Sequence, residues 1–171
     1  MVRKFVLLLL VLTACALPAF AQHDTDAYFG FAHETGDVAK NGWNLSGSYG
    51  FADIISGEAD FGGYYGSHQH SGNSNNTHTF VFGPNIHKPY RKQHFAPFGH
   101  ILFGFAHNHD GDRGGDQGST AFAYMLGVGT DFNFNSGWAA RAKVDLVHTH
   151  FFNDGQTNLR VGIGVAYHFG K

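Results

Sequence analysis

Apolar and polar residues alternate along most of the chain beyond residue 26, and residues 158–169 give the clearest example. Large apolar side chains occupy every second position there, and Gly, Ala or polar residues stand between them. A period of two places the apolar residues on one face of a β-strand. The other face carries small residues and Arg160, which is typical of a narrow, partly wet barrel interior. This stretch therefore predicts a strand whose apolar face points outward.

The same alternation predicts eight antiparallel strands separated by short hairpin connections. The stretches 67–76 and 108–118 lack the alternation and are rich in polar residues and glycine, so we expect them to be loops. Connections would then be tight after the second and sixth strands and longer after the third and fifth, as in outer-membrane barrels. The predicted strands cover residues 27–33, 42–51, 55–66, 77–86, 95–107, 120–132, 138–150 and 158–169.

Charged residues within these strands lie on the face opposite the aromatic residues. An eight-stranded barrel has an interior that side chains nearly fill, so opposite charges can pair there. We expect Arg160 to reach Asp145. We also expect either Arg141 or Lys143 to cross to the third strand, where Glu58 and Asp60 lie. The predicted lumen charge network consists of Glu58, Asp60, Asp131, Arg141, Lys143, Asp145 and Arg160.

A soluble secreted β-barrel or sandwich is the alternative fold, in which the apolar face would pack into a core. Aromatic residues near the strand ends favour the membrane instead, because such rings gather at the interface between lipid and water. No apolar run beyond the leader reaches the ~18 residues of a spanning helix. These interfacial residues include Trp43, Phe51, Tyr65, Phe132, Trp138, Tyr167 and Phe169.

The N-terminus has the pattern of an export signal. Arg3 and Lys4 precede the apolar run 5–12, and the small-x-small sequence 19–21 offers a cleavage site. We expect a signal peptide at residues 1–21 and one barrel domain at residues 22–171. Residues 12–15 also resemble the lipobox of bacterial lipoproteins, in which case Cys15 would be lipidated rather than removed.

Composition narrows the class of protein further. The 171 residues suffice for one domain, and 24 glycines with 16% aromatic and 14% charged residues suit many short strands. Removing Arg3 and Lys4 from the 11 basic residues leaves 9 against 13 acidic ones, so we expect no nucleic-acid partner. Without Cys15 the mature chain has no cysteine and no disulfide.

The end of the chain carries a more specific pattern. Gly164, Tyr167 and Phe169 resemble the Gly-x-x-aromatic-x-aromatic signal by which the barrel-assembly machinery recognises outer-membrane barrels for insertion. From Tyr28 to Phe169 the chain resembles the small eight-stranded outer-membrane barrels grouped with the OmpA-like transmembrane domain.

This resemblance implies an all-β, eight-stranded, antiparallel up-and-down transmembrane barrel in the bacterial outer membrane. It implies a monomer that contacts outer-membrane lipid and lipopolysaccharide, with both termini in the periplasm. The length leaves no room for the peptidoglycan-binding domain that some relatives carry, so we expect no role in tethering the cell wall.

Thirteen histidines include three His-x-His pairs. Residues two apart share a face of a strand, so each pair could present two imidazoles to one zinc, copper or nickel ion. The other interpretation is that polar loops simply contain histidine. The first pair follows the inward parity of its strand and the other two the outward parity, so convergence of all three would require loop rearrangement. The candidate metal ligands are His68, His70, His107, His109, His148 and His150.

These patterns together favour a non-enzymatic integral outer-membrane barrel with a filled lumen and a structural or surface-interaction role, without a resident cofactor. A small pore gated by exchange of ion pairs is the first alternative, and a soluble binding module is the second. A lipid A-modifying enzyme is the third: His148 and His150 lie at the outer rim, but no serine or acid stands beside them as that chemistry requires.

Overall fold

The computed structural model describes residues 24–36, 38–67, 74–87, 94–112, 115–135, 137–151 and 154–169. Its described part consists of β-strands and their connections, and no helix in it is long and apolar enough to cross a membrane. The strands are β1 (Thr25–Glu34), β2 (Lys40–Ala52), β3 (Ile55–Ser67), β4 (Ser74–His87), β5 (Phe95–Asp112), β6 (Gly115–Asn133), β7 (Trp138–Phe151) and β8 (Asp154–Phe169).

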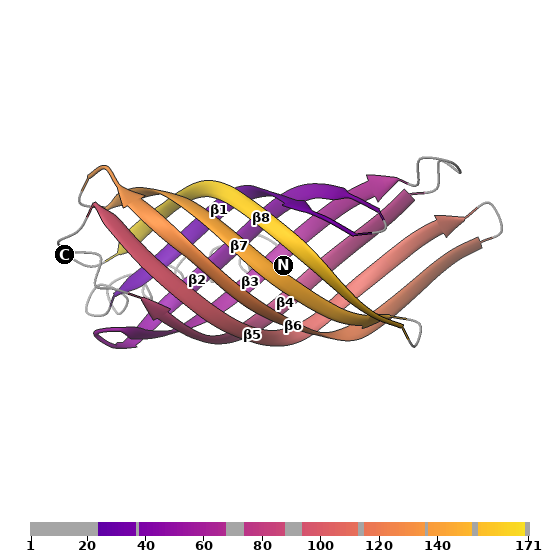
Figure 1. Ribbon diagram of the computed structural model, residues 1–171, viewed down its shortest axis with the longest axis horizontal. Helices are drawn as coiled ribbons and strands as arrows, with labels where there is room; N and C mark the ends of the chain where they lie inside the picture. Colours follow the sequence, from indigo (N-terminus) through magenta and orange to yellow (C-terminus); the bar gives the residue numbers. More distant parts are fainter. Residues whose placement is uncertain are drawn as a thin grey trace, which may run out of the picture.

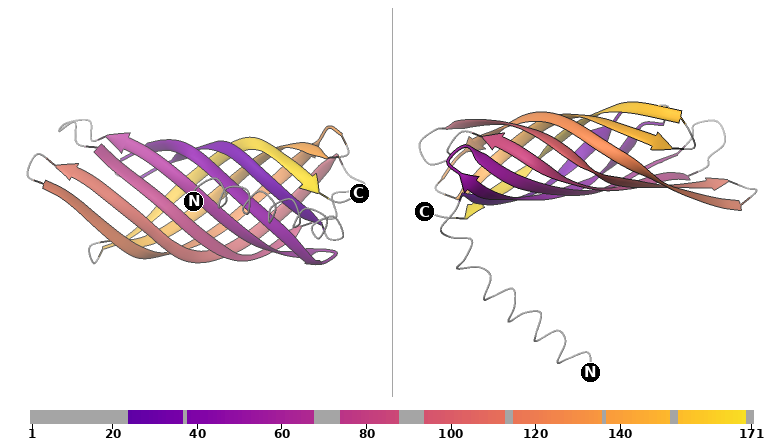
Figure 2. Two further views of the ribbon diagram at one scale, coloured as in Figure 1. Left: turned by 180° about the vertical axis from the view of Figure 1, so that it is seen from behind. Right: turned by 90° about the horizontal axis from the view of Figure 1, so that it is seen from below.

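Each strand pairs antiparallel with the next, and β1 pairs with β8 to close the barrel. The tilted strands wind around one central axis in all three views (Figures 1 and 2). The predicted fold class, an eight-stranded antiparallel up-and-down barrel, is confirmed. Closure leaves no open sheet edge, which satisfies the backbone hydrogen bonds that a lipid environment cannot satisfy.

Side-chain size and polarity separate the two faces of the wall. Outward residues are large and apolar: Phe29 is 62% exposed and Ile163 is 65% exposed. Their inward neighbours, such as Tyr28, are buried. A soluble barrel or sandwich would bury the apolar face in a core, so the soluble alternative is wrong about which face points inward.

The prediction of a loop at residues 108–118 is wrong. Strand β5 continues to Asp112, β6 begins at Gly115, and these two residues pair with each other. Likewise β4 begins at Ser74, inside the loop predicted at residues 67–76. Outward positions beyond the apolar belt do not need apolar side chains, so the alternation stops although the backbone ladder continues.

The two ends of the barrel differ in what they carry. We call the end where β1 begins and β8 ends the terminal rim. The opposite end, where β1 passes into β2 and β5 passes into β6, is the distal rim. The β5–β6 hairpin extends beyond β7–β8 at the distal rim (Figure 1).

Candidate functional site

The barrel interior is the candidate functional site, because the structure gathers buried charges there from opposite walls. Lys143 on β7 donates to Asp60 on β3, with 2.7 Å between Nζ and Oδ2. Strands β3 and β7 are four positions apart in a ring of eight, so this contact crosses the diameter of the barrel. Asp60 also accepts from the Asn44 amide at 2.9 Å. All seven predicted lumen charges are buried.

His100 on β5 joins the same two walls. Its Nδ1 lies 2.9 Å from Glu58 Oε2, and its Nε2 lies 3.2 Å from Asp145 Oδ1. An ionised carboxylate only accepts hydrogen bonds, so this geometry fits an imidazole with a proton on both nitrogens. Glu58 also accepts from Asn85 Nδ2 at 2.6 Å. The imidazole therefore links β3, β5 and β7 across the interior.

Arg160 on β8 extends the network toward the distal rim. Its Nη2 lies 2.8 Å from Glu34 Oε2, and its Nη1 lies 3.9 Å from Asp60 Oδ1. The guanidinium also stacks on the ring of Tyr64, 4.1 Å from its centroid. Arg160 lies opposite both Glu34 and Asp145 in the strand register. The expected Arg160–Asp145 pair is replaced by Arg160–Glu34, because Asp145 is turned toward His100 and Lys143.

A second cluster lies nearer the terminal rim. Arg141 makes a two-point contact with Asp131, at 2.7 and 2.8 Å, and its Nη1 lies 2.9 Å from Asp26. His168 Nε2 lies 3.2 Å from Asp131 Oδ2, and Ser48 donates to Asp26. Paired planar groups of this kind are among the stronger ionic contacts in proteins. Of the two cations that could cross to the third strand, Lys143 does so, whereas Arg141 pairs with Asp131 on β6 and Asp26 on β1.

Sequence reasoning missed several members of this network. Asp26, Glu34, Lys40 and His100 are buried with the predicted charges. Their inward parity was the available signal: His100 shares it with Leu102, and Asp26 shares it with Tyr28. Asp26, Glu34 and Lys40 stand at the ends of their strands, where a charged residue reads equally well as part of a loop.

Apolar side chains fill the interior on the distal side of His100. These side chains come from β4, β5, β6 and β7 and form one buried cluster. The interior thus holds both a network of charges and, beyond His100, a cluster of apolar side chains. The cluster consists of Val81, Leu102, Ala106, Ala123, Met125 and Val147.

Inward-facing glycines make room for the large interior side chains. A Cβ at Gly30 would lie 2.1 Å from the Tyr28 hydroxyl, and one at Gly164 would lie 2.4 Å from Gly30 Cα. Gly30 and Gly164 lie opposite each other where β1 closes against β8. Two residues without side chains therefore allow the closing strands to approach and the Tyr28 ring to lie across them.

Gly127→Ala is expected to lower the free energy of unfolding by about 1–3 kcal/mol, the usual range for overpacking. A Cβ there would lie 2.2 Å from both His100 Nε2 and Asp145 Oδ1, so it would push these partners apart. The matched control is Gly99→Ala, whose Cβ would make ordinary contacts at 3.6 and 3.8 Å. Denaturant unfolding in lipid vesicles measures both variants, and equal stabilities would contradict the packed arrangement around His100.

Four of the six candidate metal ligands lie on the outer face near the distal rim: His107 and His109 on β5, and His148 and His150 on β7. His68 and His70 lie outside the described residues. Within the part of the chain that the structure describes, no group of three or more His, Cys, Asp or Glu residues could hold a metal ion. Among the described residues, the structure therefore does not bring the pairs of β5 and β7 together into one closed site.

Two residues of the predicted insertion signal, Tyr167 and Phe169, lie at the terminal rim, whereas Gly164 lies opposite Gly30 farther into the wall. The Tyr167 ring packs edge-on against Phe169 and Trp138, with centroids 4.8 Å apart in both pairs. These rings form part of the aromatic edge that outer-membrane barrels place at an interface.

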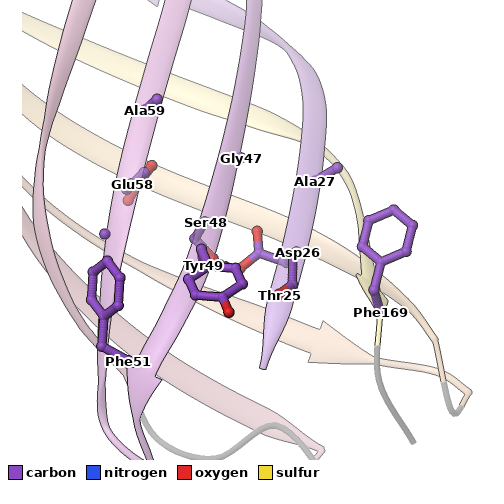
Figure 3. Close-up of a pocket in the computed structure, with 11 residues that line it drawn as sticks. Thr25, Asp26, Ala27, Gly47, Ser48, Tyr49, Phe51, Glu58, Ala59 and Phe169 are labelled. Carbon is purple, nitrogen blue, oxygen red and sulfur yellow. Dashed lines mark hydrogen bonds between the residues drawn. The ribbon is translucent and has the colours of Figure 1, made fainter. Parts of the chain in front are cut away.

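An apolar hollow of about 560 Å³ lies on the outer wall over β1, β2 and β3. Small residues form its floor, since Ala27 lies opposite Gly47 and Gly47 opposite Ala59. Figure 3 shows the rings of Phe51 and Phe169 at its sides. The accessible surface of the hollow is almost entirely apolar.

A closed barrel with an apolar exterior and a charged, filled interior defines a transmembrane β-barrel. The sequence profile described as "Outer membrane protein beta-barrel domain" matches residues 7–169. The chain belongs to this family of bacterial outer-membrane proteins, and the suspected family is confirmed. A comparison with curated proteins gave no match.

Solved structures of small outer-membrane barrels share the fold. Ail, the attachment invasion locus protein of Yersinia pestis, is 16% identical with a TM-score of 0.61, covering 86% of this chain and 99% of that chain. Neisserial surface protein A is 9% identical with a TM-score of 0.64, covering 86% and 96%. OprG from Pseudomonas aeruginosa is 12% identical with a TM-score of 0.57, covering 89% and 98%. Identities this low show a common fold alone.

Proposed function

We propose that this protein is a sealed, non-enzymatic barrel that anchors its distal hairpins at the cell surface, where they contact a partner. The Asp60–Lys143 contact across the diameter is the observation that carries the proposal. Together with the His100 contacts and the apolar cluster, it occupies the path that an ion or solute would need. A filled interior favours an anchoring role over the alternative of a small pore.

The outer surface supports the choice of the distal rim as the interacting end. Outward positions near this rim are polar, and His33 and Asn41, which face each other there, are hydrogen-bonded at 2.9 Å. Farther down the wall, outward positions are aromatic or aliphatic. In this proposal the apolar belt contacts outer-membrane lipid and lipopolysaccharide, the barrel is monomeric, and the distal rim faces outside the cell.

Residues of the leader and of the terminal rim would serve biogenesis in this proposal. The leader at residues 1–21 would direct export and then be removed, although it lies outside the described residues. The aromatic pair Tyr167 and Phe169, with Gly164, would be read by the barrel-assembly machinery during insertion. Export and insertion would both come before the surface function, and neither would involve the distal hairpins.

Single-channel recording tests the sealed interior. We expect no resolved conductance steps when the folded protein is reconstituted in a planar bilayer, because the interior ion pairs hold one another in place. An open porin reconstituted in the same way shows that insertion and recording work. Faster migration of the unboiled protein on an SDS gel establishes that the barrel is folded. Stable, reproducible steps from the folded protein would overturn the sealed barrel in favour of a pore.

A further inference from the structure

The β7–β8 hairpin carries an arrangement of histidine, threonine and glycine on its outer face. In the strand register His148 lies opposite Thr157, and His150 lies opposite Gly155. The β5–β6 hairpin repeats the same pairing. There His107 lies opposite Thr120, and His109 lies opposite Gly118. Two hairpins thus carry a His-x-His pair opposite a threonine and a glycine.

The first histidine of each pair is oriented by the threonine opposite to it. His148 Nδ1 lies 2.8 Å from Thr157 Oγ1, and His107 Nδ1 lies 2.8 Å from Thr120 Oγ1. The His148 ring also stacks on Tyr124, with centroids 4.7 Å apart and planes inclined by 26°. When Nδ1 donates to a hydroxyl, Nε2 retains a lone pair for a ligand. Such a contact typically fixes the ring of a metal-binding histidine.

The glycine leaves an open space between the two imidazoles of β7. A Cβ built at Gly155 would lie 3.4 Å from His148 Nε2 and 3.4 Å from His150 Nδ1. The two nitrogens therefore flank one small volume, which any other residue at position 155 would occupy. On the β5–β6 hairpin the three atoms nearest to such a Cβ belong to His107 and Asn108. The shared space is thus a feature of β7–β8.

We propose that His148, His150, Gly155 and Thr157, here called the imidazole clamp, bind one divalent transition-metal ion on the outer face at the distal rim. His148 Nε2 and His150 Nδ1 are the protein ligands, and water completes the coordination. Both nitrogens would lie about 2.0–2.1 Å from the ion, so the exposed His150 side chain rotates toward His148. Imidazole ligands bind Cu²⁺ more tightly than Zn²⁺ or Ni²⁺. The clamp is independent of the sealed interior and goes beyond the proposed anchoring role.

Copper titration of the folded, tag-free barrel in detergent micelles tests the clamp, with calorimetry for affinity and electron paramagnetic resonance for nitrogen ligation. Removing both ligands in H148A/H150A is expected to abolish one copper equivalent and its two-nitrogen signal. Thr157→Val keeps both ligands but removes the hydroxyl that orients His148, and should weaken binding about 10-fold or more. Gly155→Val also keeps both ligands but fills the space between them, and should abolish the same equivalent.

The matched control is His94→Ala, which removes an exposed histidine near the terminal rim and should leave copper binding unchanged. Unboiled gel mobility verifies that each variant is folded. The proposal is overturned if H148A/H150A binds copper with unchanged stoichiometry and affinity. It is also overturned if His94→Ala lowers binding as much, since copper would then bind surface histidines without a built site.

Discussion

Replacing Arg160 by Met is expected to lower the free energy of unfolding by about 3–5 kcal/mol, the usual cost of removing one partner from a buried ion pair. Arg160 and Glu34 are both buried and lie 2.8 Å apart. Met fills much of the same space, so the loss would come chiefly from the carboxylate of Glu34, left buried without its cation. Guanidinium unfolding in lipid vesicles measures the difference.

A double variant separates charge from packing. Adding Glu34→Gln to Arg160→Met removes the uncompensated charge, and we expect it to recover about 1–3 kcal/mol of the loss. Val161→Met is the matched control, because Val161 is the next residue along β8 and lies on the outer face. If Arg160→Met costs no more than Val161→Met, the interior ion pairs do not hold the barrel together.

Leu126→Arg is expected to cost about 2–4 kcal/mol in a lipid bilayer, the range for a cation at mid-depth on the outer wall of a barrel. Leu126 is 51% exposed and lies between Ile101 of β5 and Leu146 of β7, two further outward apolar residues. A charged side chain there must reach through hydrocarbon for water. The same vesicle unfolding measurement gives the difference from the parent protein.

The matched control for the outer wall is His150→Arg, at the polar distal end. We expect it to stay within about 1 kcal/mol of the parent, because cations near the interface cost little. Equal effects of Leu126→Arg and His150→Arg would mean that Leu126 does not face hydrocarbon. The pair of variants thus locates the membrane on the outer wall.

Local pattern was sufficient for the strands within the membrane and failed beyond it. Period-two alternation predicted β2 as residues 42–51 and β7 as 138–150, close to Lys40–Ala52 and Trp138–Phe151. It missed the outer parts of β5 and β6, where Asp112 pairs with Gly115. Lipid imposes the alternation, and beyond the apolar belt backbone hydrogen bonding alone maintains the strand.

In the candidate site, the sequence likewise predicted which residues face inward but not which partners they contact. Parity predicted that Lys143 and Asp60 face inward, and crossing to the third strand was among the expected contacts. It could not choose between partners: Arg160 lies opposite both Glu34 and Asp145, and His100 takes up Asp145. Similarly, the sequence shows the His148-x-His150 pair, whereas the space above Gly155 depends on the register of β7 against β8.

The alternation in the sequence is enough to predict which residues face lipid and which face inward. A strand has a fixed period of two, and outer positions within the membrane must be apolar to contact lipid. The tertiary structure alone decided the partners. Closure of eight strands brings β3 opposite β7, so a contact between Asp60 and Lys143 depends on the circumference and tilt of the whole barrel. Residues 83 positions apart meet there because the wall curves round, and no local pattern encodes that distance.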